Sequence, residues 1–417
     1  MKIAIIGAGI SGLSAAYLLY KKHQITVFEA SDKLGGHTAT VDVELQGSSY
    51  KIDTGFIVYN DWTYPNFIRL MEKLGVQSQP TEMSFSVSCD TSGLEYGGNN
   101  LNTLFAQRKN IFKPSYLKML WEIMRFNKQA IADLDDNNID PAMTLGQYLN
   151  INGYSAAFSS QYLIPMGSAI WSASTLSMFD FPLLFFVRFF KNHGLLSVNN
   201  RPQWRVIKGG SREYIAPLTS GFKDDIQLGA SIDKILRNKY GVELYFKGGG
   251  REYFDQVILA CHSDQALALL ADSSNAERSI LAAIPYQENE VILHTDECLL
   301  PRKKLAWSSW NYRKQSTQQE RAVLTYNMNI LQGIEAPVTF CVTLNAKETI
   351  DSNKILGRYN YSHPVFSLAS VAAAERWKEI NGVNKTWFCG AYWANGFHED
   401  GASSGIRVAQ ALGAVWT

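Results

Sequence analysis

The chain has 417 residues, of which 46% are hydrophobic and 12% aromatic, enough for a large buried core and more than one domain. Its 39 basic and 38 acidic residues leave a net charge of +1, which excludes the strongly basic profile of a nucleic-acid-binding protein. The 5 scattered cysteines, with no Cys-x-x-Cys pair, argue against a disulfide framework or a zinc site and favour buried thiols in a reducing, cytoplasmic compartment.

The N-terminal residues predict a strand, a glycine turn, a helix and a second strand. The apolar run Lys2 to Ile6 is followed by Gly7-Ala8-Gly9-Ile10-Ser11-Gly12, a GxGxxG motif, and by a helix from Ser11 to about Lys22. In this motif the first glycine permits the turn, the second admits a pyrophosphate and the third lets the helix pack closely. The second strand, Gln24 to Glu29, ends in an acid placed to accept ribose hydroxyls, which disfavours NADP.

This order predicts a Rossmann-type dinucleotide site. The glycines also interrupt the opening run, and no later run reaches the roughly 18 apolar residues that span a bilayer. We therefore expect neither a signal peptide nor a membrane span.

Two later stretches distinguish FAD from NAD. They are ASDKLGGHTATV, with Gly35-Gly36, and KIDTGFIVYN, with Asp53-Thr54-Gly55. Taken alone they predict a surface turn and a bent strand. In order after GxGxxG, they resemble the flavin-dependent amine oxidase and phytoene desaturase superfamily. That resemblance implies FAD as cofactor, with contacts from Ala30, Gly35, Gly36, His37, Thr54, Gly55, Phe56 and Ile57. His37 stands where arginine is usual, so a fixed cation beside the pyrophosphate is missing.

The C-terminal stretch resembles the closing motif of the same superfamily. A strand from Lys385 to Gly390 leads through AYWANGFHEDGASSG into a helix predicted from Ala402 to Leu412. The resemblance implies that backbone amides near Gly401 and Ala402 face the flavin and stabilise negative charge there. Asp400 is predicted to be the N-cap of this helix. Ala391 replaces the acid that usually follows the glycine.

A middle stretch completes the resemblance to the cofactor half. Strands are predicted at Gln227 to Arg237, Gly241 to Phe246 and Phe254 to Cys261, with the main chain of Ile232 beside the adenine. The implied fold class is α/β, with a Rossmann-type FAD-binding domain of the GR2-like amine oxidase fold and a discontinuous α+β substrate domain. The FAD domain would comprise 1–75, 202–272 and 384–417, and the substrate domain 76–201 and 273–383.

The substrate half is predicted from hydrophobic patterning. Residues 115–135 form an amphipathic helix, with Leu117, Leu120, Ile123, Met124 and Phe126 near its apolar face. The phenylalanine-rich stretch from Phe179 to Phe190 is interpreted as core, or alternatively as a tunnel wall or a peripheral membrane contact with Arg188 and Lys191 at head-group level. Alternating runs between 286 and 343 suggest an antiparallel sheet. The aromatic residues that either line an apolar site or belong to the core are Trp307, Trp310, Tyr312, Tyr326 and Trp393.

The resemblance implies an enzyme that transfers hydride from a substrate C–H to flavin N5. His398 and Glu399 are the candidate catalytic residues, with a structural histidine and a helix-dipole carboxylate as the alternatives. No Ser-His-Asp order, HExxH motif or metal-ligand spacing competes with them, so we expect no metal site.

Two stretches, RPQWRVIKGGSREY and NGFHEDGASSG, look like a bacterial group of flavoproteins encoded beside cyclopropane fatty acyl synthases. This implies a fatty acyl or phospholipid substrate and a cytoplasmic protein, at most peripheral at the inner membrane face. An amine oxidase, a non-redox flavin isomerase and a flavin-binding accessory subunit of a lipid-modifying enzyme remain alternatives.

Overall fold

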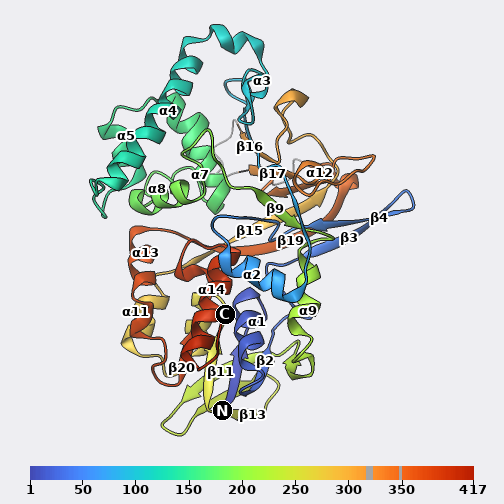
Figure 1. The fold of residues 1–417 in the computed structure, drawn as a ribbon, viewed down its shortest axis with the longest axis vertical. Helices are drawn as coiled ribbons and strands as arrows, with labels where there is room; N and C mark the ends of the chain where they lie inside the picture. The colour runs from blue at the N-terminus through green and yellow to red at the C-terminus, as the bar shows by residue number, and fades with distance from the viewer. Residues whose placement is uncertain (316–322, 347–349) are drawn as a thin grey trace.

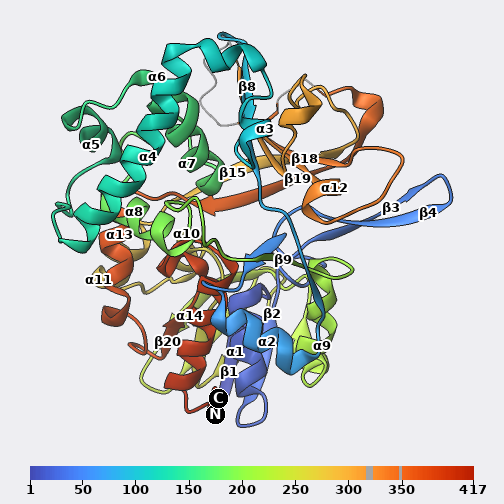
Figure 2. The same cartoon turned by 45° about the horizontal axis from the view of Figure 1, so that its top comes forward.

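The computed structural model describes residues 1–315, 323–346 and 350–417. Residues 316–322, part of the predicted sheet between 286 and 343, lie outside the described residues. Two lobes stack along the long axis of the molecule, and strands β15 and β19 run between them in both views (Figure 1 and Figure 2).

The lower lobe of Figure 1 is built around a parallel five-stranded sheet in the order β10-β2-β1-β14-β20. Its strands are β1 (Lys2–Ile6), β2 (Gln24–Phe28), β10 (Ile226–Gln227), β14 (Gln256–Leu259) and β20 (Thr386–Phe388). Side chains of β1 alternate between two cores, with Ile5 in one and Ala4 in the other. Burial on both faces explains why these strands are almost continuously apolar.

Helices cover one face of this sheet, and a small antiparallel sheet with further helices covers the other. The first face carries α1 (Ile10–Leu19), α2 (Pro65–Leu74), α9 (Ile215–Thr219) and α14 (His398–Ala411). The second carries β11 (Ile232–Arg237), β12 (Val242–Phe246), β13 (Arg251–Phe254), α10 (Ser263–Leu269), α11 (Asn275–Leu281) and α13 (Leu368–Glu375). A Cβ on Gly405 would lie 2.1 Å from the Ser11 carbonyl oxygen, so α14 packs directly against α1.

The upper lobe combines a seven-stranded sheet with a helical layer. The sheet order is β19-β15-β18-β17-β16-β7-β8, antiparallel except between β16 and β7. Its strands are β7 (Phe85–Cys89), β8 (Leu94–Gly97), β15 (Tyr286–His294), β16 (Trp310–Lys314), β17 (Val323–Asn327), β18 (Cys341–Leu344) and β19 (Ile355–Pro364). The helices are α3 (Leu101–Leu104), α4 (Pro114–Asp135), α5 (Leu145–Ile151), α6 (Ala156–Phe158), α7 (Ile164–Trp171) and α8 (Leu183–Asn192).

Short elements connect the two lobes. They are the hairpin β3 (Thr40–Leu45) and β4 (Ser48–Asp53), the sheet β5 (Val58–Asn60), β9 (Trp204–Ile207) and β6 (Ser78–Pro80), and helix α12 (Met328–Leu331). All five strands of the parallel sheet come from the three stretches predicted for the cofactor half. However, α11 and α13, which were predicted to belong to the substrate domain, pack in the core beside that sheet.

Several predicted boundaries were wrong. The predicted strand Gln227 to Arg237 is divided between β10 and β11, which belong to different sheets. The closing helix begins at His398 rather than Ala402.

The predicted burial of the cysteines was wrong at two positions. Cys261 is only partly buried and Cys298 is exposed, although both were expected in the core.

The predicted helix at 115–135 is confirmed, and of its predicted apolar face Phe126 is buried while Leu120 and Ile123 pack partly buried against the core. α4 buries Tyr116, Met119 and Phe126, whereas Leu117 and Met124 are exposed. The phenylalanine-rich stretch is core: Phe186, Phe189 and Phe190 are buried against Trp171 and its neighbours, and Lys191 pairs with Asp135. Most of this stretch is therefore core, although Phe179 at its start is 39% exposed. No helix among the described residues combines the length and apolar character needed to cross a membrane.

Candidate functional site

A cavity of about 800 Å³ lies where β1, β2, β14 and β20 end, and residues of both lobes line it. Ile6, Phe28, Ala260 and Gly390 mark the carboxyl ends of these strands at its wall. Ligands of open parallel sheets bind at this edge, because the loops and helix N-termini there present unpaired amides.

The glycine turn after β1 forms a cradle in this cavity. Gly9 has an extended backbone (φ −78°, ψ −178°), and a Cβ added to it would meet no atom within 4 Å. Gly35 donates its N–H to the Ala8 carbonyl (2.9 Å), which brings the second glycine pair against the first. The absence of a side chain at Gly9 therefore leaves open space directly at the start of α1, the shape that a pyrophosphate requires.

Glu29 at the end of β2 borders the same cradle. Its Oε2 accepts a hydrogen bond from the Ala8 N–H (2.8 Å), and its Oε1 accepts one from the Ser31 N–H (2.9 Å). The carboxylate is thus fixed beside the glycine turn and still lines the cavity. Asp233 and Lys247 line the cavity as well. An acid so placed suits the hydroxyls of a ribose.

The part of the cavity between the lobes is apolar. Its walls come from β5, α7, β15–β18, α12, the loop after β19 and the residue before α14. They are Val58, Ile170, Trp171, Val291, Trp310, Tyr326, Leu331, Leu344, Phe366 and Phe397. Among the described residues that line the whole cavity, the acidic and strongly basic ones are Glu29, Asp233 and Lys247. None of these three residues lines the part between the lobes. We call this part the apolar compartment.

Sequence comparison places these features in a known family. The profile of the family described as "Flavin containing amine oxidoreductase" matches residues 10–330. The chain belongs to this family. Its cofactor is FAD, and the dinucleotide cradle beside Glu29 fits that group.

Individual relatives share less with the chain. L-amino-acid oxidase BjussuLAAO-I of Bothrops jararacussu is 51% identical over 47 residues, which span 11% of this chain and 10% of that enzyme. Two solved structures share the fold across 99% of this chain. Cyclohexylamine oxidase from Brevibacterium oxydans IH-35A has a TM-score of 0.70 at 15% identity over 99% of its chain. The CLA-producing fatty acid isomerase from P. acnes has a TM-score of 0.69 at 15% identity over 98% of its chain.

The structure brings most of the predicted FAD residues to one cavity. Those that line it are Gly7, Gly9, Ile10, Ser11, Glu29, Ala30, Gly35, Gly36, His37, Thr54, Gly55, Phe56, Ile57, Ile232 and Gly390. Gly12, Asp400, Gly401 and Ala402 do not line it. A Cβ on Gly12 would lie 2.0 Å from the Gly7 carbonyl oxygen, so this glycine allows close packing, as its place in the motif predicted.

The N-terminus of α14 differs from its predicted geometry. Because the helix begins at His398, the Gly401 N–H is already bonded to the Phe397 carbonyl (3.1 Å) and does not face the FAD site. Asp400 lies inside the first turn rather than at the N-cap, and its Oδ2 accepts from the N–H groups of Phe397 (2.9 Å) and Asn395 (3.1 Å). Burial raises the pKa of Asp400 to about 6. The residues that do line the cavity here are Gly396, Phe397 and His398.

Of the two candidate catalytic residues, His398 lies at the cavity and Glu399 does not. His398 lines the cavity, stacks on Phe56 (3.7 Å between ring centroids), and shares hydrogen bonds through Nε2 with Tyr214 (2.8 Å) and Thr38 (3.3 Å). Burial lowers its pKa to about 3, so the ring is neutral at ordinary pH.

Glu399 points elsewhere. Its carboxylate accepts from the N–H groups of Asn66 (3.1 Å) and Phe67 (2.8 Å) at the start of α2. That geometry matches the structural alternative, a carboxylate at a helix N-terminus.

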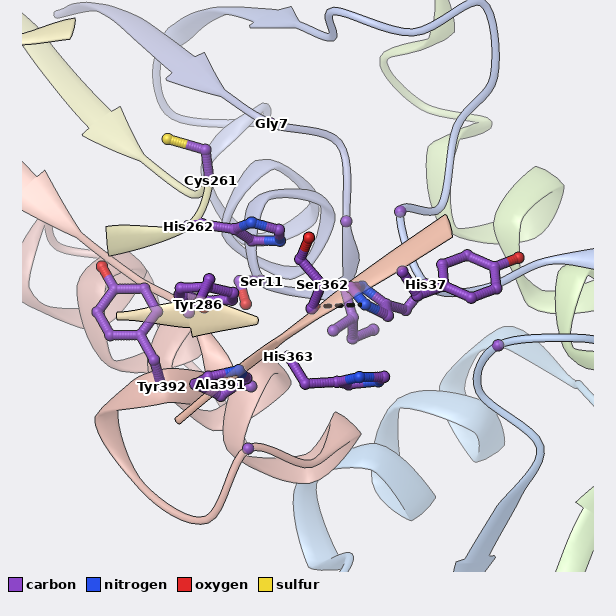
Figure 3. A pocket seen from close by; sticks show the side chains of 18 of the residues that line it. Gly7, Ser11, His37, Cys261, His262, Tyr286, Ser362, His363, Ala391 and Tyr392 are labelled. Atoms are coloured by element: carbon purple, nitrogen blue, oxygen red, sulfur yellow. Dashed lines mark hydrogen bonds between the residues drawn. The ribbon is translucent and has the colours of Figure 1, made fainter. Parts of the chain in front are cut away.

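Three histidines that surround one part of the cavity were only partly anticipated. Figure 3 shows His37, His262 and His363 projecting into the pocket from three different segments. Ring centroids of His37 lie 6.1 Å from His262 and 5.4 Å from His363. Burial lowers the pKa of His37, that of His262 to about 4 and that of His363 to about 3. His262 directly follows the predicted strand that ends at Cys261 and was recognisable from that position, whereas nothing near His363 in the sequence indicated a site.

A buried acid holds the loop that carries Thr54 and Phe56. Asp53 accepts hydrogen bonds from the Ser211 N–H (2.9 Å), the Thr40 hydroxyl (2.6 Å) and Gln332 Nε2 (3.0 Å). Burial outweighs these bonds and raises its pKa to about 6. This network ties the loop of the cofactor half to β3, to the turn after β9 and to the end of α12. Asp53 is therefore a positioning residue for the cavity wall.

Of the aromatic residues proposed for an apolar site, only Trp310 and Tyr326 line the cavity. Tyr312 and Trp393 belong to packed cores, and Trp307 donates its indole N–H to the Pro301 carbonyl (2.7 Å). Alternation along a strand predicts that aromatics share a face, but it does not say which face meets the cavity.

Proposed function

We propose that this protein is an FAD-dependent oxidoreductase that desaturates a neutral, apolar chain, such as a fatty acyl or phospholipid chain. The observation that carries this proposal is the apolar compartment, which contains no acidic or strongly basic side chain among its described lining residues. The carboxylate and ammonium of an α-amino acid would lose their hydration there without gaining a counter-ion, which is costly. An alkyl chain has no charged group to dehydrate, and the burial of its apolar surface is favourable.

In this proposal two adjacent C–H bonds break and a C=C bond forms. FAD supplies the two-electron acceptor for the hydride when it is bound. The chain's own residues orient the substrate, exclude water and take the second hydrogen as a proton. Trp310, Tyr326 and Phe397 provide flat walls for an alkyl chain. We assign the proton acceptor to a ring nitrogen of neutral His398, whose ring is held by Phe56, Tyr214 and Thr38.

Anaerobic mixing with a substrate panel tests the substrate class. The FAD-loaded protein is mixed with an acyl-phospholipid, a simple aliphatic amine and an α-amino acid, and flavin absorbance is followed. We expect bleaching with the lipid and none with the amino acid. Bleaching by the amine alone would assign an amine oxidase, because an uncharged amine also fits aromatic walls. Lipid isomerisation without bleaching would assign an isomerase, and a silent flavin that co-purifies with a lipid-modifying enzyme would assign an accessory subunit. Each of these three outcomes contradicts the proposal.

The roles of His398 and Glu399 are separable by substitution. In His398→Phe, we expect FAD to stay bound and anaerobic reduction to slow by about a hundredfold or more, the usual effect of losing a general base. In Glu399→Gln, we expect the reduction rate to stay within about twofold, while unfolding becomes easier by about 1 kcal/mol, because the α2 N-terminus loses its carboxylate. Stopped-flow absorbance and thermal melts measure the two effects. Equal reduction rates for His398→Phe and wild type would refute the assignment.

A further inference from the structure

The helix predicted to bury Leu117 and Met124 instead exposes them on the outside of the upper lobe. Trp121 and Met124 are 58% and 55% exposed, and with Leu117 they follow the i, i+4, i+7 spacing of one helix face. The preceding short helix ends in Ile111 and Phe112, of which Phe112 is 86% exposed. Large exposed apolar side chains thus recur along the chain from Ile111 to Met124, and we call them the apolar line. In Figure 1 and Figure 2, α4 lies at the outer edge of the lobe, away from the parallel sheet.

The charges around this line are of one sign. From Tyr96 to Ala132, the sole acid is Glu122, which is buried and accepts hydrogen bonds from Ser155. The cations in the same stretch are Arg108, Lys109, Lys113, Lys118, Arg125 and Lys128. The next acid, Asp133, is about two and a half helical turns beyond Met124. The exposed charged side chains from Tyr96 to Ala132 are therefore all positive.

A small cleft adjoins this line. Its volume is about 340 Å³, and Lys109, Asn110, Phe112 and Lys113 contribute to its wall. Two ammonium groups at a cleft beside an exposed phenylalanine suit a phosphate head group whose acyl chains continue along the apolar line.

We infer that Ile111, Phe112, Leu117, Trp121 and Met124, together with Lys109, Lys113, Lys118 and Lys128, form a docking face for the surface of an anionic phospholipid bilayer. The aromatic and aliphatic side chains enter the head-group boundary while the lysines remain at the phosphates. Charge complementarity selects an anionic over a zwitterionic surface. The inference rests on these residues alone and holds for any substrate of the cavity.

Vesicle co-sedimentation of the FAD-loaded protein tests this docking face. We expect binding to phosphatidylcholine vesicles containing phosphatidylglycerol, little binding to phosphatidylcholine alone, and loss of binding as salt rises. Removing both apolar anchors (Phe112→Ser with Trp121→Ser) is expected to weaken binding by about tenfold or more. Each of Lys109→Gln and Lys113→Gln is expected to weaken it by roughly fivefold.

Matched controls change equally exposed residues elsewhere. Tyr240→Ser, at a side chain that is 80% exposed, and Lys239→Gln are expected to bind vesicles like wild type. All variants should keep their FAD content and melting temperature, since the substituted side chains project into solvent. No preference for phosphatidylglycerol in the wild type, or equal loss in the controls, would overturn the inference. Soluble polyglutamate provides a further test. If the protein binds polyglutamate but not vesicles, and the same variants lose this binding, the face belongs to an acidic protein partner and the inference is overturned.

Discussion

In Gly9→Val, FAD binding is expected to weaken by at least about a hundredfold while the protein still folds, because the valine side chain occupies the pyrophosphate cradle. The backbone at Gly9 is extended (φ −78°, ψ −178°), a conformation that valine adopts readily. A Cβ there meets no protein atom within 4 Å. The substitution therefore fills the space left for the ligand without displacing the chain. Equilibrium dialysis against FAD, with circular dichroism of the cofactor-free protein, measures both parts of this expectation.

Two other glycines serve as controls for Gly9→Val. Gly98→Val places a side chain at an exposed site whose nearest neighbour is the Phe85 carbonyl oxygen at 3.5 Å, an ordinary contact, so FAD binding should be unchanged. Gly12→Val drives a Cβ to 2.0 Å from the Gly7 carbonyl oxygen and should prevent folding. Full FAD occupancy in folded Gly9→Val would show that the pyrophosphate lies elsewhere.

FAD affinity is expected to rise as pH falls toward about 4, the pKa of His262 in the cofactor-free protein, by up to roughly tenfold per pH unit for each proton taken up. The cause is the histidine cluster beside the glycine turn. His37 follows Gly36, and a Cβ added to Gly36 would lie 3.2 Å from the Gly9 Cα. His262 follows Cys261, and a Cβ added to Gly7 would lie 3.2 Å from the Cys261 backbone nitrogen. Both histidines thus flank the cradle that the pyrophosphate dianion would occupy.

The sign of this pH dependence follows from the direction of the shifts. In the cofactor-free protein, burial lowers the pKa of His37 against the opposing hydrogen bond to the Ser362 carbonyl. Burial and repulsion from the neighbouring histidines lower the pKa of His262 to about 4 and that of His363 to about 3, so all three rings are neutral near pH 7. Asp264 opposes this weakly at His262. A nearby dianion raises these pKa values, so binding takes up protons and is favoured at lower pH.

Calorimetric titration at several pH values, in buffers of different ionisation enthalpy, measures the proton uptake. ADP-ribose, which carries the same diester pyrophosphate, should show the same pH dependence as FAD, whereas riboflavin, which has no phosphate, should show none. His37→Gln should flatten the profile, because one protonatable ring is lost. A flat profile for FAD in the wild-type protein would rule out the histidines as proton-dependent counter-charges.

The cofactor half was predictable because its signals are local. Gly7 to Gly12 and Glu29 lie within one strand-turn-helix-strand unit, whose geometry depends on residues close in sequence. The start of α14 was misplaced because HEDG contains residues that favour caps, and whether Asp400 lies before or inside the first turn depends on tertiary contacts of Glu399 with α2.

The substrate half was less predictable because its patterns fit more than one arrangement. On α4, apolar residues occur on two faces, and the sequence does not show that Met119 meets the core while Leu117 and Met124 do not. The stretch from Phe181 to Phe190 contains the same residue types as a membrane contact and proved to be mostly core. His363 reaches the cavity from β19, far along the chain from the glycine turn, so only the tertiary fold reveals it.

A single turnover under anaerobic conditions tests the proposed desaturation most directly. FAD-loaded protein is mixed with a limiting amount of acyl-phospholipid, and the reduced flavin and the mass of the recovered lipid are measured in the same sample. The proposed reaction predicts one equivalent of reduced flavin for each lipid molecule that loses two hydrogen atoms. Oxidised flavin together with a lipid of unchanged mass would contradict it.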